Sequence, residues 1–313
     1  MLLSVLLIVA LLSAITVRMM SRHSLTIAQA RQSLGADLTL SYALGAETLA
    51  RQLLFRDWEA DEAPKNDTLF DEWAQPLQPF ELAEYDNAFL EIQIADRGSC
   101  FNLNAMAHTE QQKAQLAHQQ FRRLLQILEL PPNMADTWKD WVDADELNTG
   151  FGAEDNEYLL KPAPYRAANR PAADISELRL LANLDPQQRA AVAPFVCVLP
   201  TTDLLINLNT APWQVLASLN EALTPSFLEP LVRGERRYES VNEVTGEYPE
   251  LQASIENLAV ESEYFELRAQ VDIDGNLTEI SSLLFRNGED GRLSLVRRDL
   301  GQPFVSLYED DGT

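Results

Sequence analysis

Residues 1–17 carry no charged side chain, and this run constrains the fold more than any other part of the sequence. Arg18 ends the run, and the first proline of the chain is Pro64. Twenty helical residues at about 1.5 Å each cover the hydrocarbon core of a bilayer, which is about 30 Å thick. The sequence therefore predicts a membrane-spanning helix at its N-terminal end.

This apolar start differs from an ordinary secretory signal, which has a basic n-region and a small-residue cleavage site. Neither is evident in the sequence. Two interpretations follow. One is a simple N-terminal membrane anchor, and the other is a pilin-like subunit whose short leader has been removed.

The helical pattern continues beyond the membrane segment. Apolar residues at helical spacing form one stripe: Ile27, Leu34, Leu38, Tyr42, Leu49 and Leu53. Charged residues form the polar remainder: Arg22, Arg31, Asp37, Glu47 and Arg51. Gly35 and Gly45 weaken a helix without ending it. We expect one helix of about 55 residues whose second half packs on a sheet or on a partner.

Composition limits the classes of partner and site. Of 313 residues 46% are hydrophobic, which is enough for real cores beyond the anchor. The formal charge of −24 repels phosphate backbones and favours cations or basic partners. Cys100 and Cys197 form no CxxC pair, and the chain has only three histidines. This small number of sulfur and imidazole ligands makes a zinc site improbable. In an oxidising compartment a single disulfide and two buried free thiols are equally fair interpretations.

Strand patterns lie on either side of a long helical region. Residues 64–79 are typical of a linker, and residues 89–95 alternate as a strand does. Helical periodicity then predicts helices at 111–130, 134–143, 174–181, 186–194, 212–219 and 225–232. Strands at 264–273, 278–286 and 292–298 follow, with hairpin turns at 274–276 and 287–291. This order predicts a helical insertion inside an α+β domain.

Helix starts have recognisable capping residues. Thr109 precedes Gln112, and Asp185 precedes Pro186 at a first helical position. Asn209 or Thr210 is expected to cap the helix that begins near Pro212.

An acidic stretch follows the helix predicted at 134–143. With Asp143 as position one, Asp145 and Glu154 fall at positions three and twelve, where a calcium loop has carboxylate ligands. Asn148 stands where an EF-hand has glycine. Oxygen donors without sulfur or histidine suit a hard cation. The alternatives are a solvated acidic loop and a hydrolase that uses Glu154 and Asp155, although no nucleophile motif accompanies them.

A second motif, residues 206–212, resembles the opening of a helix-hairpin-helix module of DNA-uptake and repair proteins. The phosphate-binding hairpin of that module needs glycines, and residues 220–225 contain none. With a charge of −24, we expect no nucleic-acid binding. A membrane-anchored DNA-uptake protein remains the alternative function.

Taken together, these segments resemble the K minor pseudopilins of the type II secretion pathway. The resemblance covers nearly the whole chain: the apolar N-terminal end, residues 96–104, 141–145, 152–155 with Tyr158, Tyr165 with Asn169, residues 177–178 and residues 206–211. Most pilins carry glutamate at the fifth mature position. Val5 stands there in this sequence, as K-type members also lack that glutamate.

The resemblance implies a structural, non-enzymatic subunit. Its fold would be α+β, with a long N-terminal helix packed on an antiparallel pilin sheet and a large all-α, partly SAM-like insertion. It would cap the pseudopilus with the I and J minor pseudopilins, assist pseudopilus initiation and help to export folded proteins across the outer membrane. Other pseudopilins and the inner-membrane secretion platform are further implied partners, with no nucleic acid and no small-molecule substrate.

The resemblance also implies a location and a cofactor. The chain would cross the inner membrane of a Gram-negative bacterium once, with its globular part in the periplasm and a methylated mature N terminus at Met1. Calcium would bind in the insertion. The expected ligands are Asp143, Asp145, Glu154 and Asp155, with Asn148 and Asn169 as weaker candidates.

The expected parts of the chain follow from these patterns: the transmembrane half-helix (1–22), the pilin-like helix and first strands (23–105), the helical insertion (106–205), a second small helical module (206–258) and the C-terminal strands (259–313).

Overall fold

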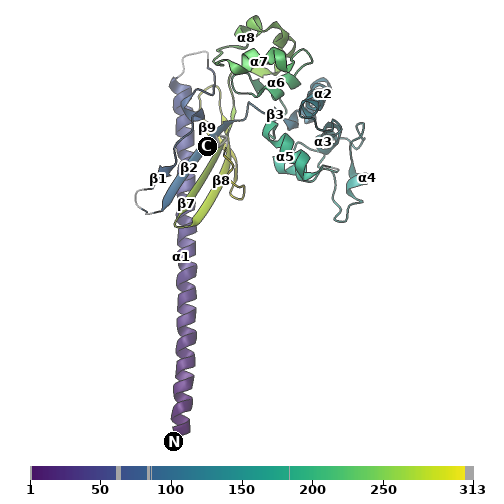
Figure 1. Cartoon of the computed structure of the whole chain (residues 1–313). Coiled ribbons are helices and arrows are strands. Elements are labelled where there is room, and N and C mark those ends of the chain that lie inside the picture. The colour runs from purple at the N-terminus through teal and green to yellow at the C-terminus, as the bar shows by residue number, and fades with distance from the viewer. Residues whose placement is uncertain (1, 61–64, 83–84, 86, 183, 307–313) are drawn as a thin grey trace.

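A single long helix, α1 (Leu2–Ala60), dominates the shape of the molecule (Figure 1). The computed structural model describes residues 2–60, 65–82, 85, 87–182 and 184–306. Every described residue before Gly35 is exposed, and the helix is long and apolar enough to cross a membrane. The predicted uninterrupted helix is thus confirmed. Met1, with its expected methylation, and Pro64, which begins the expected linker, lie outside the described residues.

An antiparallel sheet of five strands, in the order β1-β2-β7-β8-β9, packs against the C-terminal half of α1. The strands are β1 (Phe80–Glu81), β2 (Ala88–Asp96), β7 (Tyr264–Ile273), β8 (Asn276–Arg286) and β9 (Leu293–Asp299). All four strands that the sequence predicts are present. Asp274 and Gly275 have φ values of 52° and 82°, which is the left-handed backbone that the predicted hairpin turn requires.

The face of α1 that meets the sheet differs from the predicted stripe. Ala43, Ala46 and Ala50 are almost fully buried, because small side chains let a helix approach a sheet closely. Of the predicted stripe, Leu53 is buried, Leu38, Tyr42 and Leu49 are half-buried, and Ile27 and Leu34 are exposed. The sheet covers only the upper part of α1, so the rest of the stripe has no cover within the described chain.

Glu47 was placed on the polar side of α1 by its sequence spacing, and this placement is wrong. Its side chain is 4% exposed and accepts hydrogen bonds from Arg51, Ser282 and Arg298. These partners come from α1 itself, β8 and β9. A charged residue of α1 thus joins the helix to the last two strands of the sheet.

Between β2 and β7 the chain forms a group of short helices that lies beside the sheet (Figure 1). The α-helices are α2 (Gln111–Ile127), α3 (Met134–Val142), α4 (Asp155–Tyr158), α5 (Pro186–Val192), α6 (Trp213–Ser218), α7 (Pro225–Arg233) and α8 (Val241–Glu247). The 3₁₀ helices of the chain are η1 (Glu72–Ala74), η2 (Leu103–Ala107), η3 (Ile175–Arg179), η4 (Ala193–Phe195) and η5 (Pro249–Asn257). The helix predicted at 174–181 is therefore the 3₁₀ helix η3. The long helical region confirms the predicted insertion.

One apolar core runs through all of the helices between β2 and β7. Its buried members extend from Phe101 to Leu258 and include Trp138, Tyr158 and Leu216. A separate core fills the space between α1 and the sheet. The boundary predicted between residues 205 and 206 falls inside the first core, and the division into two helical modules stays a prediction.

The junction between sheet and helices is built from two short parallel pairs. These are β3 (Phe101–Asn102) with β4 (Val196–Cys197), and β5 (Ile206–Asn207) with β6 (Leu258–Ala259). Beside the first pair, Cys100 and Cys197 form a disulfide, with their Cα atoms 5.8 Å apart. The bridge joins the entry and the exit of the first helical stretch.

Helix caps were predicted with mixed success. Asp185 caps α5 with a full capping box, as expected. Thr109 does not cap α2, whose N-cap residue is Glu110. Pro212 precedes α6 without a side-chain cap, whereas Asn209 bonds to Tyr238 and the Thr210 hydroxyl bonds to Asp96. Asn209 and Thr210, the expected caps of α6, are therefore engaged in tertiary hydrogen bonds and do not cap that helix.

Candidate metal centre and family

Three carboxylates gather where α3 ends and the loop to α4 begins. Asp143 follows the last residue of α3, Asp145 lies two residues on, and Glu154 immediately precedes α4. One oxygen from each lies within 4.8 Å of the other two. Glu154 is 3% exposed, Asp143 is half-buried and Asp145 faces solvent. The structure therefore brings together three of the four carboxylates expected at the site.

Two aspartates of α3 hold the loop against the helix. The backbone N–H of Thr149 donates to both oxygens of Asp140, at 2.9 and 3.1 Å. The N–H of Phe151 donates to Asp136 at 3.2 Å. At Gly152, an added Cβ would lie 1.9 Å from Asp140 Oδ2, so only glycine fits there. These contacts fix the path of the chain that leads to Glu154.

Asp136 also ties the loop to α2. Its Oδ1 accepts a hydrogen bond from Arg122 at 2.6 Å and lies 2.8 Å from His118 Nε2. Sequence reasoning missed Asp136 and Asp140 as parts of the site. Asp140 was detectable in principle, because it lies one helical turn before Asp143 and therefore on the same face of α3.

Oxygen atoms at the site lack hydrogen-bond donors. Among the described residues, Asp143 Oδ1 and both carboxylate oxygens of Glu154 are buried without a partner. Asn169 Oδ1 is also buried and unpaired, while the Asn169 N–H donates to Trp141 O and its Nδ2 donates to Asp145 O. A buried acceptor without a donor is costly, and a cation satisfies such oxygens directly.

Burial and mutual repulsion raise the pKa values of the carboxylates at this site. Burial, followed by the charges of Asp140, Asp143 and Asp145, raises the pKa of Glu154 to about 7. Burial and the neighbouring Asp145 raise the pKa of Asp143 to about 6. Carboxylate and amide oxygens alone form the donor set, which suits calcium better than a transition metal. The residues present therefore fit a calcium ion.

Two of the expected ligands have other contacts. Asp155 Oδ1 accepts from the N–H of Ala167 at 2.9 Å, and its Oδ2 forms an ion pair with Arg166 at 3.2 Å. Asn148 Nδ2 donates to the carbonyl of Gly152 at 3.2 Å. The structure does not place either residue in the group of three carboxylates, because each side chain serves to hold the loop.

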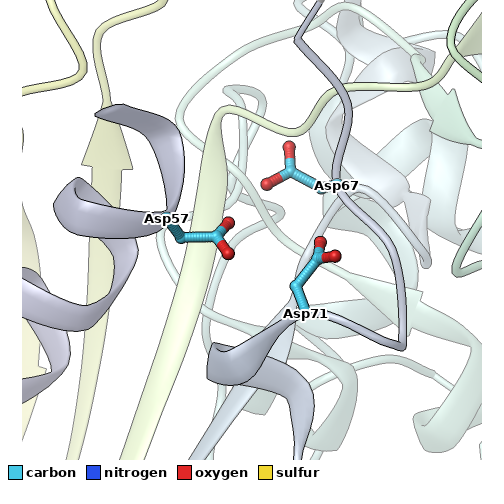
Figure 2. A group of neighbouring side chains, drawn as sticks. All are labelled: Asp57, Asp67 and Asp71. Carbon is cyan, nitrogen blue, oxygen red and sulfur yellow. The ribbon is translucent and has the colours of Figure 1, made fainter. Parts of the chain in front are cut away.

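A second group of carboxylates lies at the upper end of α1, where Figure 2 shows Asp57, Asp67 and Asp71 facing one another. Asp67 is 1% exposed, pairs with the buried Arg286 and accepts a hydrogen bond from the N–H of Ser262 at 2.7 Å. Asp71 accepts from the N–H and hydroxyl of Thr68. Arg286 already supplies a positive charge here, so this group joins the loop to the sheet through an ion pair.

The motif that resembled a helix-hairpin-helix opening lies inside the molecule. Ile206, Asn207 and Leu208 are fully buried, and Asn207 Nδ2 donates to Asp67 O, Asp96 Oδ2 and Ser262 Oγ. Its side chains are therefore used in the junction between sheet and helices. The structure gives no support to the alternative of DNA binding through this motif.

The fold is that of a pilin-like subunit: a long exposed helix, an antiparallel sheet on its upper half and a helical insertion. Comparisons with known proteins identify the family. The family model for type II secretion system protein K matches residues 99–201. Type II secretion system protein K of Pseudomonas aeruginosa is 35% identical over 99% of this chain and 96% of its own length. The corresponding protein of Pectobacterium carotovorum subsp. carotovorum is 33% identical over 96% of this chain and 95% of its own. The chain therefore belongs to the protein K family of the type II secretion system, a family of minor pseudopilins.

A solved structure agrees over most of the chain. One chain of the crystal structure of the GspK-GspI-GspJ complex from the enterotoxigenic Escherichia coli type 2 secretion system matches with a TM-score of 0.76 and 28% identity. The match covers 88% of this chain and all of that one. The predicted family and fold class are confirmed.

Proposed function

We propose that this chain is the subunit at the tip of a type II secretion pseudopilus, where it assembles with the I and J minor pseudopilins. The observation that carries the proposal is the structural match, which spans every residue of a chain taken from a complex of these three subunits. In this role the protein primes pseudopilus growth and helps to move folded proteins across the outer membrane.

The shape of the molecule supports a terminal position. The helical insertion widens the globular part to one side of the sheet (Figure 1), and such bulk obstructs subunits stacked above it. Below the sheet, Ile27 and Leu34 of α1 are 49% and 69% exposed. Apolar side chains on a helix that continues beyond its own sheet are suited to packing against helices of neighbouring subunits.

The N-terminal half of α1 then anchors the protein in the inner membrane, and the globular part lies in the periplasm. The anchor is supported by residues 2–17, which form an uncharged, exposed stretch of helix. The Cys100–Cys197 disulfide supports a periplasmic position, since disulfides persist in oxidising compartments.

The acidic loop holds calcium in this proposal. Asp143, Asp145 and Glu154 supply carboxylate oxygens, and Asn169 supplies a neutral amide oxygen. The ion neutralises buried carboxylates and fixes the loop between α3 and α4. Its role is structural, and the protein as a whole acts by assembly rather than by catalysis.

Co-purification tests the assembly. The full chain in detergent, mixed with I and J subunits at about micromolar concentration, is expected to elute as a stoichiometric complex, because typical specific interfaces bind in that range or tighter. Leu34→Glu should weaken the complex, whereas Gln32→Glu, two residues away on the opposite side of α1, should not. A chain that stays monomeric with both partners present would contradict the proposal.

A further inference from the structure

A cleft lies between the sheet and the helical insertion. Its volume is about 540 Å³, and its walls come from five parts of the chain: strands β7 to β9, the segment that carries Cys197, the last described residues, Arg97 after β2, and Ile175 at the start of η3. The charged residues among its lining are Arg97, Glu266, Arg268 and Arg297. Three guanidinium groups thus meet one carboxylate in a chain whose net charge is −24.

The single carboxylate is shared. Glu266 is 6% exposed, and Arg268 donates to its two oxygens from Nε and Nη2 at 3.2 and 3.3 Å. Arg97 forms an ion pair with Glu266 Oε2, and the Ser281 hydroxyl donates to Oε1 at 2.7 Å. Glu266 therefore serves two half-buried guanidinium groups, whose side chains are 20% and 18% exposed.

Burial lowers the pKa of Arg97 to about 9, with repulsion from Arg268 as the next cause. The charge of Asp96 opposes this shift, and Arg297 adds to it. A cation held beside two others is stabilised by any anion that enters the cleft.

Arg297 stands at the open side of the cleft. Its side chain is 39% exposed and reaches Asp174 Oδ2 at 2.6 Å and the carbonyl of Ala173 at 2.7 Å. Arg268 Nη1 donates to the carbonyl of Val305 at 3.2 Å, so all three nitrogens of Arg268 have protein partners. Arg297 is therefore the guanidinium group that an incoming oxyanion can reach from solvent.

The remaining walls are largely apolar. They include Ile175, Val196, Val198, Leu199, Leu283, Pro303 and Val305. A small hydrated anion gains nothing from contact with apolar walls. A peptide segment with an acidic side chain and an adjoining apolar side chain can pack the apolar one against them. The volume lies within the usual range for a ligand pocket, about 300–1,000 Å³.

We propose that this cleft between the sheet and the helical insertion binds an acidic segment of a partner protein, with a carboxylate on the guanidinium groups and an adjoining apolar side chain on the walls. The arginine fork matches a carboxylate in a bidentate manner. This binding surface is separate from the exposed stripe of α1 and does not depend on the assembly proposed above.

The test measures binding of a short peptide to the full chain in detergent by titration calorimetry. The probe is an acetylated and amidated peptide of alternating leucine and glutamate, compared with its leucine–glutamine counterpart and with inorganic phosphate. The glutamate peptide should bind at least about tenfold tighter than either, since one charge-assisted hydrogen bond supplies that much. Added salt should weaken its binding.

Variants test the residues. Arg297→Gln should lose about tenfold in affinity for the glutamate peptide. Arg292→Gln, the same change at an 83% exposed side chain outside the cleft, should lose nothing. Val305, 61% exposed at the rim, offers a second pair: Val305→Glu places a competing carboxylate in the cleft and should abolish binding, whereas Val305→Gln should not.

Equal affinity for the glutamate and glutamine peptides would overturn the proposal, as would unchanged binding by both Arg297→Gln and Val305→Glu. Phosphate binding as tight as that of the peptide would overturn the assignment to an acidic protein segment. Melting temperatures of all variants show whether a loss of affinity reflects a loss of fold, and the Val305 pair decides the matter if Arg297→Gln does not fold.

Discussion

Glu47 in α1 and Arg298 in β9 form a bidentate ion pair across 251 residues of sequence. Arg298 Nε lies 2.9 Å from Glu47 Oε2, and Arg298 Nη2 lies 3.0 Å from Glu47 Oε1. The Ser282 hydroxyl on β8 donates to the same carboxylate. The last strand of the sheet is thereby fastened to the helix that begins the chain.

Removing this charge should destabilise the packing of α1 on the sheet. Glu47→Gln is expected to lower the free energy of unfolding by about 1.5–3 kcal/mol, the usual contribution of a hydrogen bond to a charged group. Glu59→Gln, at an exposed position of the same helix, is the matched control. Urea denaturation measures both, and equal midpoints for the two variants would contradict a structural role for Glu47.

The disulfide should be formed in protein taken from the periplasm. Thiol labelling under denaturing conditions should detect no free thiol at Cys100 or Cys197, and two labelled thiols per chain would contradict the bridge. The bond closes a loop with a sequence separation of 97 residues. A Cys100→Ser, Cys197→Ser double variant should therefore lose about 4.7 kcal/mol of stability by the chain-entropy model.

Calcium should stabilise the helical insertion. At a hundredfold excess over its dissociation constant, the ion should add about 2.7 kcal/mol to the free energy of unfolding, so a chelator should lower the melting temperature. Magnesium should replace it poorly, because its small octahedral shell fits a wide carboxylate site badly. Elemental analysis that finds no metal, together with a melting temperature unchanged by chelation, would leave a solvated acidic loop.

Variants distinguish the ligands from their neighbours. Asp143→Asn and Glu154→Gln should abolish the effect of calcium on the melting temperature. Asp155→Asn should retain it, because the Asp155 carboxylate is engaged by Arg166 and Ala167. Loss of the calcium effect in Asp155→Asn alone would show that Asp155 is the true ligand.

The pH dependence of the calcium-free protein should report Glu154. Its pKa is about 7 in the folded state against an ordinary value of 4.5, so the folded protein holds a proton that the unfolded chain has released. The stability that depends on Glu154 is therefore fully present below about pH 4.5 and lost as pH rises to about 7. Saturating calcium should reverse this trend, because it binds the ionised carboxylate.

Comparison of wild type with Glu154→Gln isolates this group from the other titrating carboxylates. The difference in melting temperature between the two proteins without calcium should change between pH 4.5 and 7 and stay constant above. A difference that does not vary over this range would mean that Glu154 titrates normally.

Much of the site was predictable, because its main residues are close in sequence. Asp143, Asp145 and Glu154 belong to one loop, and their spacing indicated a hard-cation site before any fold was known. Asp155 and Asn148 lie outside this group of three carboxylates. Their partners, Arg166 with Ala167 and the carbonyl of Gly152, depend on how the loop folds back on α3.

Local patterns determined the elements of the fold. Spacings of two, three and four residues encode strands and helices directly, so α1, the helical insertion and strands β2, β7, β8 and β9 followed from the sequence alone. The capping box of Asp185 is of the same kind, because all of its hydrogen bonds lie within four residues.

Only the tertiary structure decided which surfaces those elements bury and which charges meet. The sheet reaches α1 along Ala43, Ala46 and Ala50 rather than along the larger apolar stripe, because close approach requires small side chains. Glu47 and Arg298, like Asp67 and Arg286, are brought together from positions more than two hundred residues apart. The pairing of distant charges depends on the register of strands and on the path of the chain, and no local spacing in the sequence encodes it.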